Sequence, residues 1–231
     1  MTQKNHVLIP GAWHGAWVWQ PVAHRLRAAG HRALPLTMPG VDGDPSGVTL
    51  ADAVGHVVDT IVRLDLHDVT LIAHSWGGYP ATGAAVRVPE RIAEVVYVSA
   101  VVPRAGVSQA DELVPEMGAF VRGAIESSGG TVPIDLGSVQ TVLLPGEPEP
   151  VQRLVAELLV PHPGAYFLDT LDEATLRVPA RYVLAEDDIA LAKPGAEFAA
   201  RLGVEPVLVP GGHEALLTHP DEVAAAILKT A

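Results

Sequence analysis

The chain has 231 residues, of which 48% are hydrophobic and 18% are charged, and its formal net charge is -12. That length and composition are typical of one globular domain with a sizeable core. Because acidic residues outnumber basic ones by 27 to 15, nucleic acid and anionic lipid surfaces are excluded as expected partners. The absence of cysteine excludes disulfides, thiol nucleophiles and thiolate metal sites.

Short apolar runs alternate with amphipathic stretches over residues 1–102. Strands are predicted at 6–9, 31–36, 69–73 and 92–102, and helices at 17–29, 50–66 and 76–86. Runs that are apolar throughout are typical of a parallel sheet covered on both faces. The start of the chain does not resemble a signal peptide, and no apolar run approaches the ~20 residues of a membrane span. We therefore expect a cytoplasmic protein without a membrane partner.

The strand-helix rhythm stops at residue 103 and resumes near 179. Proline and glycine are frequent in between, helices are predicted at 109–127 and 150–160, and no core strand is evident. Strands at 181–185 and 205–209 and helices at 195–202 and 220–229 follow. The sequence thus predicts an α/β core formed by residues 1–102 and 179–231, with a mostly helical lid inserted at 103–178.

Ser75 stands where the apolar run 69–73 passes into a predicted helix. A serine at a sharp strand-to-helix turn presents its hydroxyl at the sheet edge, and small residues two positions away let strand and helix cross. Ala73 and Gly77 meet that need. The pentapeptide also occurs by chance, so its interpretation as a nucleophile depends on an acid and a histidine following in order.

An acidic cluster and a histidine follow the last two predicted strands. Residues 186–188 read Glu-Asp-Asp, and His213 comes after a diglycine. The carboxyl ends of parallel strands meet at one edge, so these groups and Ser75 are expected to converge. A serine hydroxyl needs a base to take its proton, and an acid orients that base. His74 and His219 have simpler packing or capping interpretations, and no spacing indicates a zinc site.

The loop after the first predicted strand, residues 10–17, is rich in glycine and tryptophan. Its spacing fits neither G-x-G-x-x-G nor G-x-x-x-x-G-K-[ST], so no nucleotide cofactor is expected. Such a loop can turn a backbone N–H toward a developing oxyanion. Ala12 is the candidate donor, together with the N–H of Trp76 directly after the serine.

Four motifs carry a resemblance to a known family: residues 11–17, 73–78, 182–188 and 211–213. In order and spacing they resemble the α/β-hydrolases, in the branch of plant methyl esterases, salicylate-binding esterases and hydroxynitrile lyases. The resemblance covers nearly the whole chain except the predicted lid. It implies an α/β-hydrolase fold and, by position, Asp188 rather than Asp187 as the third member of the triad.

Within that branch the hydroxynitrile lyases carry a threonine in the oxyanion loop and a lysine after the triad histidine. This chain has Gly11 and Glu214 at those places, and a carboxylate would repel cyanide. The resemblance therefore disfavours lyase activity. Pro10 also replaces the histidine that often opens the loop, which affects its expected shape.

The leading hypothesis is a cofactor-free serine hydrolase that cleaves a small to medium apolar ester, thioester or lactone through an acyl-enzyme. A lyase or cyclase on the same scaffold and a non-catalytic ligand-binding protein remain the alternatives, since fold does not fix the reaction. Candidates for lining the substrate site, each of which could equally be ordinary core, are Gly11, Trp13, Phe120, Tyr166, Phe167 and Leu168.

Overall fold

The structure, a computed structural model, describes residues 3–229. Its centre is a six-stranded sheet in the order β2-β1-β3-β4-β7-β8, in which every neighbouring pair is parallel. The strands are β1 (Asn5–Ile9), β2 (Arg32–Pro35), β3 (Val69–Ser75), β4 (Ile92–Ala100), β7 (Ala180–Ala185) and β8 (Val207–Val209). The predicted strands are therefore all present, and the predicted parallel sheet is confirmed.

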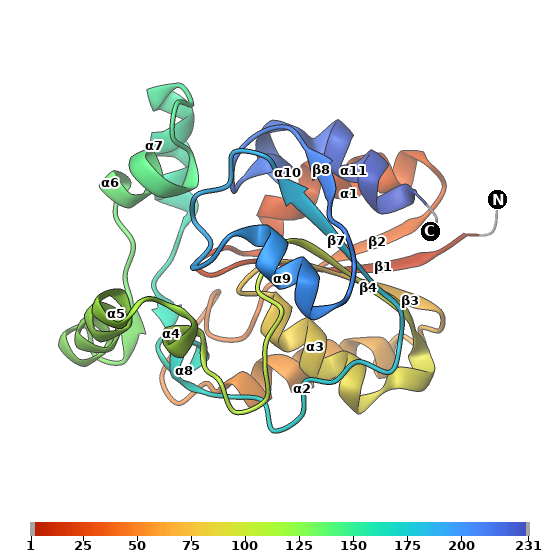
Figure 1. The fold of residues 1–231 in the computed structure, drawn as a ribbon, viewed down its shortest axis with the longest axis horizontal. Helices are drawn as coiled ribbons and strands as arrows, with labels where there is room; N and C mark the ends of the chain where they lie inside the picture. The colour runs from red at the N-terminus through yellow and green to blue at the C-terminus, as the bar shows by residue number, and fades with distance from the viewer. Residues whose placement is uncertain (1–2, 230–231) are drawn as a thin grey trace.

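Helices cover both faces of this sheet (Figure 1). One layer consists of α1 (Gln20–Ala28), preceded by the short helix η1 (Ala16–Trp19), with α10 (Ala215–Thr218) and α11 (Pro220–Leu228). The other consists of α2 (Leu50–Arg63), α3 (Gly78–Arg87) and α9 (Gly195–Arg201), with the short η2 (Pro89–Arg91) after α3. Successive strand residues serve opposite layers: Val7 and Ile9 pack in one apolar cluster and Leu8 in the other.

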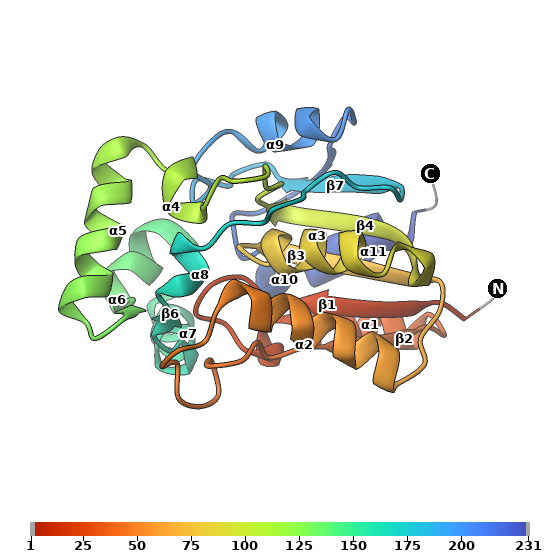
Figure 2. The same cartoon turned by 90° about the horizontal axis from the view of Figure 1, so that it is seen from below.

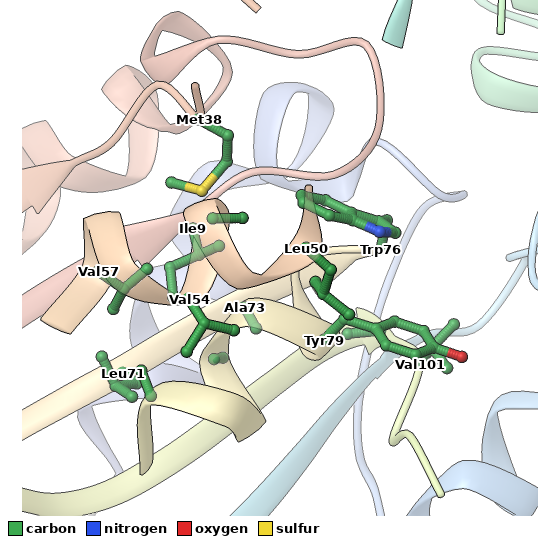
Figure 3. Packing of buried hydrophobic residues seen from close by; sticks show 14 of the residues in the cluster. Ile9, Met38, Leu50, Val54, Val57, Leu71, Ala73, Trp76, Tyr79 and Val101 are labelled. Carbon is green, nitrogen blue, oxygen red and sulfur yellow. The ribbon is translucent and has the colours of Figure 1, made fainter. Parts of the chain in front are cut away.

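The apolar cluster between the sheet and α2 reaches the strand ends (Figure 3). Ile9 and Ala73 from the strands meet Leu50 of α2, and Trp76 and Tyr79 complete the cluster beside the turn after β3. All five side chains are almost fully buried. The turn that carries Ser75 thus lies beside a fully buried apolar cluster.

Most of residues 103–178, between β4 and β7, lies beyond the carboxyl ends of the strands, and the last part runs back along the sheet to the start of β7 (Figure 2). We call this segment the insertion. It contains α4 (Gln109–Glu112), α5 (Pro115–Ser127), β5 (Thr131–Val132), α6 (Leu136–Ser138), η3 (Val139–Leu143), α7 (Glu149–Leu158), β6 (His162–Pro163) and α8 (Ala165–Leu168).

The prediction of one helix over 109–127 was wrong, because Val114 is extended (φ -62°, ψ 150°) between α4 and α5. A residue that precedes proline is disfavoured in the helical region, and Pro115 starts the second helix. The short antiparallel pair β5–β6 was not predicted either.

Candidate active site

Ser75 lies at the sharp turn between β3 and α3, with a φ of +54°. A non-glycine residue in this region is strained and is held there by its surroundings. A side chain on Gly77 would place Cβ 2.6 Å from the Pro10 carbonyl oxygen, and one on Gly78 would place it 1.8 Å from that of Val101. Both glycines are therefore required by the turn, although the sequence argument singled out only Gly77.

Ser75, His213 and Asp188 form a hydrogen-bonded chain. His213 Nε2 lies 3.0 Å from Ser75 Oγ, and His213 Nδ1 lies 2.9 and 3.0 Å from the two carboxylate oxygens of Asp188. The side chains of His213 and Asp188 are only 4% and 1% exposed. The Ala190 amide also donates to Asp188 Oδ1 at 2.9 Å. The carboxylate thus fixes the ring so that Nε2 faces the serine hydroxyl.

The pKa values of Asp188 and His213 are both shifted in the direction that favours an ion pair between them. Burial raises the pKa of Asp188, but the charge and hydrogen bond of His213 outweigh it and bring this pKa to about 2. Burial lowers the pKa of His213, yet the carboxylate of Asp188, with a smaller contribution from Glu214, places it above its usual 6.5. An imidazolium formed at His213 is therefore stabilised where it would be needed.

His74 supports the backbone of His213. The ring is fully buried, and its Nε2 donates to the His213 carbonyl oxygen at 3.0 Å. Burial, followed by the nearby histidines His213 and His14, holds the pKa of His74 well below 6.5, so this ring is neutral. The packing role expected for His74 is therefore joined by a hydrogen bond that anchors the loop after β8.

The backbone N–H groups of Ala12 and Trp76 flank the serine. Among residues 3–229, neither N–H group donates a hydrogen bond to another residue. Gly11 lies directly against the turn, because a Cβ there would come 2.8 Å from the Ser75 Cβ. Trp13, with a φ of +67°, donates its N–H to His162 Nδ1 at 3.1 Å. These contacts hold the loop against the turn that carries Ser75.

Similarity to known proteins identifies the family of this chain. A family model described as "Alpha/beta hydrolase family" matches residues 7–226. The chain belongs to the α/β-hydrolase family. This α/β-hydrolase also superimposes on an extracellular α/β-hydrolase from a Paenibacillus species, reported to share structural and functional homology with tobacco salicylic acid binding protein 2. The TM-score is 0.89 with 25% identity, covering 97% of this chain and 98% of that one.

Curated relatives of the hydrolase are named esterases. Esterase PIR7B of Oryza sativa subsp. japonica is 30% identical, over 81% of this chain and 79% of its own. A carbendazim hydrolyzing esterase of Nocardioides sp. (strain SG-4G) is 42% identical over 106 residues, which are 44% of each chain. Matches to plant methylesterases cover about 41% of the relative's length. The resemblance to this esterase branch is confirmed.

The candidate substrate-lining residues of the hydrolase fall into different environments. Gly11 and Trp13 line a small cavity at Ser75, and Trp13 packs on Phe167 with ring centroids 5.9 Å apart. Tyr166 is fully buried and stacks on Trp76 (Figure 3 shows Trp76), so it belongs to the core. Leu168 is half-buried against the same core cluster.

Phe120 does not join them. Its side chain is 70% exposed on α5, and it is absent from the lining of the cavity at Ser75. The buried side of α5 is formed by Gly118, Val121 and Ile125, which recur at helical spacing. Phe120 lies on the other side of the helix, so the expectation that it forms part of an apolar wall is not met in this structure.

The cavity at Ser75 is too small to admit a water-sized sphere, and it includes Leu143 of the insertion in its lining. A wider groove lies elsewhere, where residues 102–105 enter the insertion and 174–180 leave it, and it contains no member of the triad. Ligand atoms of His74, His213 and Glu214 lie within 4.8 Å of one another, as in a metal site. Both nitrogens of His213 are already engaged by Asp188 and Ser75, which favours the triad over an ion.

Sequence reasoning missed two buried polar groups of the site, His14 and Glu214. Their side chains are 2% and 0% exposed, and both line the cavity at Ser75. The only signal in the sequence was the position of Glu214 directly after His213, which we interpreted for its effect on cyanide and not for a partner.

None of the helices within residues 3–229 has the length and apolar character of a membrane span.

Proposed function

We propose that this α/β-hydrolase is a serine esterase that cleaves small to medium apolar carboxylic esters, or related thioesters and lactones, through an acyl-enzyme. The observation that carries the proposal is the hydrogen-bonded chain from Asp188 through His213 to Ser75, with His213 Nε2 3.0 Å from Ser75 Oγ. The named esterases among its relatives support it.

In this mechanism Ser75 Oγ attacks the ester carbonyl carbon while His213 Nε2 takes its proton. Asp188 stabilises the imidazolium, and the N–H groups of Ala12 and Trp76 bind the oxyanion. His213 returns the proton to the leaving alcohol oxygen as the C–O bond breaks. Water then attacks the acyl-enzyme with His213 as base, releasing the acid and restoring the Ser75 hydroxyl.

The side chains around the serine support an apolar substrate. Trp13 and Leu143 are the large apolar side chains of the cavity lining, beside the polar groups of His14, His74 and Glu214. Small-molecule sites usually measure roughly 300 to 1,000 Å³. Since the space at Ser75 has no room for a water-sized sphere, we propose that η3 of the insertion moves as a lid to admit the ester.

A fluorophosphonate probe tests the nucleophile without knowledge of the substrate. We expect one adduct, mapped to Ser75, that is abolished in Ser75→Ala and in His213→Ala and retained in Ser127→Ala, which changes an exposed serine on α5. Turnover of phenyl acetate in ¹⁸O-labelled water should place the label in the acetate. A folded wild-type protein without an adduct at Ser75 would overturn the proposal, and products without label would indicate a non-hydrolytic reaction.

A further inference from the structure

A second acid and histidine lie beside the triad without taking part in it. His14 Nε2 and Glu214 Oε1 are 3.4 Å apart, and both side chains are buried. Among the described residues, neither His14 Nε2 nor either carboxylate oxygen of Glu214 has a hydrogen-bond partner. Buried polar atoms without partners cost free energy, so this pair requires an explanation.

The tautomer of His14 follows from its other nitrogen. His14 Nδ1 lies 2.7 Å from the Ala12 carbonyl oxygen. A carbonyl oxygen can only accept, so Nδ1 carries a hydrogen. In a neutral His14 the lone pair of Nε2 would then face the lone pairs of Glu214 Oε1, and two buried acceptors would oppose each other. A single proton between these atoms converts the opposition into a hydrogen bond.

We propose that His14 and Glu214 share one proton and act as a second acid–histidine pair. This pair positions residues 10–17, here called the oxyanion loop, through the carbonyl group of Ala12. This inference rests on the proposed esterase function, because its effect is exerted on the Ala12 N–H. His14 and Glu214 are positioning residues here, since they touch the loop and not the reacting atoms.

One peptide group of the loop is held by hydrogen bonds at both its carbonyl oxygen and its N–H. The Ala12–Trp13 peptide is held at its carbonyl oxygen by His14 Nδ1 and at its N–H by His162 Nδ1. Trp13 follows with a φ of +67°, a strained value for a residue with a side chain. Losing the hold at the carbonyl oxygen would free Ala12 to rotate and would turn its N–H away from the oxyanion.

The shared proton also balances charge at the site. The titratable groups that face the pair directly or through one neighbour are His213, His74, His162 and Asp188. Burial first, then neighbouring charge, keeps His74 and His162 neutral, the latter with a pKa of about 3. A pair without the shared proton would carry a negative charge beside the developing oxyanion and would oppose it.

The test compares Glu214→Gln with Glu214→Leu, using phenyl acetate as the probe. The Gln amide can donate to His14 Nε2, so we expect kcat within about threefold of wild type. Leu cannot donate, and we expect kcat to fall about tenfold with KM nearly unchanged, a smaller loss than the 10²–10³ for an oxyanion donor itself. Equal kcat in wild type and Glu214→Leu would overturn the proposal.

The pH profile tests whether the pair carries a net charge. In wild type kcat/KM should rise with pH as His213 loses its proton. Because a pair that shares one proton has no net charge, Glu214→Gln should leave the midpoint of this rise in place. A midpoint that moves to lower pH in Glu214→Gln would mean that Glu214 carries an unshared negative charge, and it would contradict the shared proton. This variant is nearly isosteric, so it decides the question if Glu214→Leu does not fold.

Two variants of His14 provide a second matched comparison. The amide of His14→Asn can still donate to the Ala12 carbonyl oxygen, whereas His14→Ala cannot, so the Asn variant should retain more kcat. Fluorophosphonate labelling separates the two proposals. Unlabelled wild-type Ser75 would overturn the esterase function and this inference together, while labelled wild type with all four variants at wild-type rates would overturn this inference alone.

Discussion

The insertion leaves more of its large apolar side chains exposed than the core does, in which Ile189 and Leu208 are the most exposed. Phe120, Val114 and Leu154 of the insertion are 70%, 59% and 58% exposed, while the tryptophan that follows the serine in the core, Trp76, is 1% exposed. Side chains in the densely packed core have little freedom, so the strand ends can fix a triad to a few tenths of an ångström. The insertion packs on the core through Tyr166, Phe167 and Leu171, and a few polar contacts add to this attachment.

Two of those polar contacts show how the insertion is attached. Glu112 of α4 is buried between Arg201 of α9 and Lys193, at 2.8 to 2.9 Å. Trp13 of the oxyanion loop donates its indole N–H to the Val132 carbonyl oxygen at 2.9 Å. Packing in the core holds Ser75, His213 and Asp188, whereas polar pairs help to attach the insertion, so changes in the two regions should affect different measurements.

The largest expected effect is on the core. Asp188→Asn should lower kcat by about 10⁴-fold while leaving stability much less affected, because the imidazolium loses its counter-charge and the ring its orientation. Since Asp188 raises the pKa of His213, the rising limb of kcat/KM should move to lower pH in this variant. Steady-state kinetics across pH, beside thermal unfolding, checks both. If the midpoint of the rising limb stayed in place, Asp188 would not be the group that raises the pKa of His213.

The next effect concerns the attachment of the insertion. Glu112→Gln should lower the free energy of unfolding by about 1 to 3 kcal/mol, because the half-buried Arg201 and Lys193 lose the carboxylate that they share. Burial raises the pKa of Glu112, but hydrogen bonds and charges of these two residues bring it to about 2, below its usual 4.5. The contribution is therefore complete above pH 4.5 and is lost as pH falls toward 2.

Urea unfolding of wild type and Glu112→Gln at neutral pH and at about pH 3 measures this contribution. The difference between the two proteins should be largest at neutral pH and should shrink in acid. Exposed Glu149, which pairs only with Arg153 one helical turn away, supplies the control, and Glu149→Gln should cost under about 0.5 kcal/mol. A difference at Glu112 that grows in acid would show that its carboxylate does not hold the insertion.

The sequence predicted the core well because its signals are local. Each core strand is a short apolar run, and Ser75 was found from the small residues around it. The triad acid was harder, since Asp187 and Asp188 are adjacent and only the turn after β7 decides which faces His213. Position within the family, and not the residues themselves, favoured Asp188, the residue that the structure brings to His213.

What could not be predicted depends on contacts between distant residues. His14 and Glu214 are 200 positions apart, so nothing in either neighbourhood indicates a buried pair. Strands β5 and β6 are each two residues long, which is too short for any periodicity. Phe120 was interpreted from its residue type alone, and which side of α5 faces the protein is set by Gly118, Val121 and Ile125.

A smaller effect is expected where the insertion meets the loop after β2. Tyr166 of α8 donates its hydroxyl to the Pro39 carbonyl oxygen at 2.9 Å. Tyr166→Phe keeps the ring stacked on Trp76 but removes this bond, so the free energy of unfolding should fall by about 1 kcal/mol. Chemical unfolding measures the change, and fluorophosphonate labelling of Ser75 should stay the same. A slowed labelling rate would mean that α8 also positions the turn.

The smallest effect is expected at Phe120, and it tests whether the exposed apolar side of the insertion matters to the site. Because this side chain is 70% exposed, Phe120→Ala should change the free energy of unfolding by under about 0.5 kcal/mol. Phe167→Ala, at a residue only 5% exposed, is the control and should cost about 3 kcal/mol or more. If Phe120→Ala raised KM for phenyl acetate more than about threefold without loss of stability, Phe120 would reach the substrate after movement of the insertion, because only a change of position could bring it there.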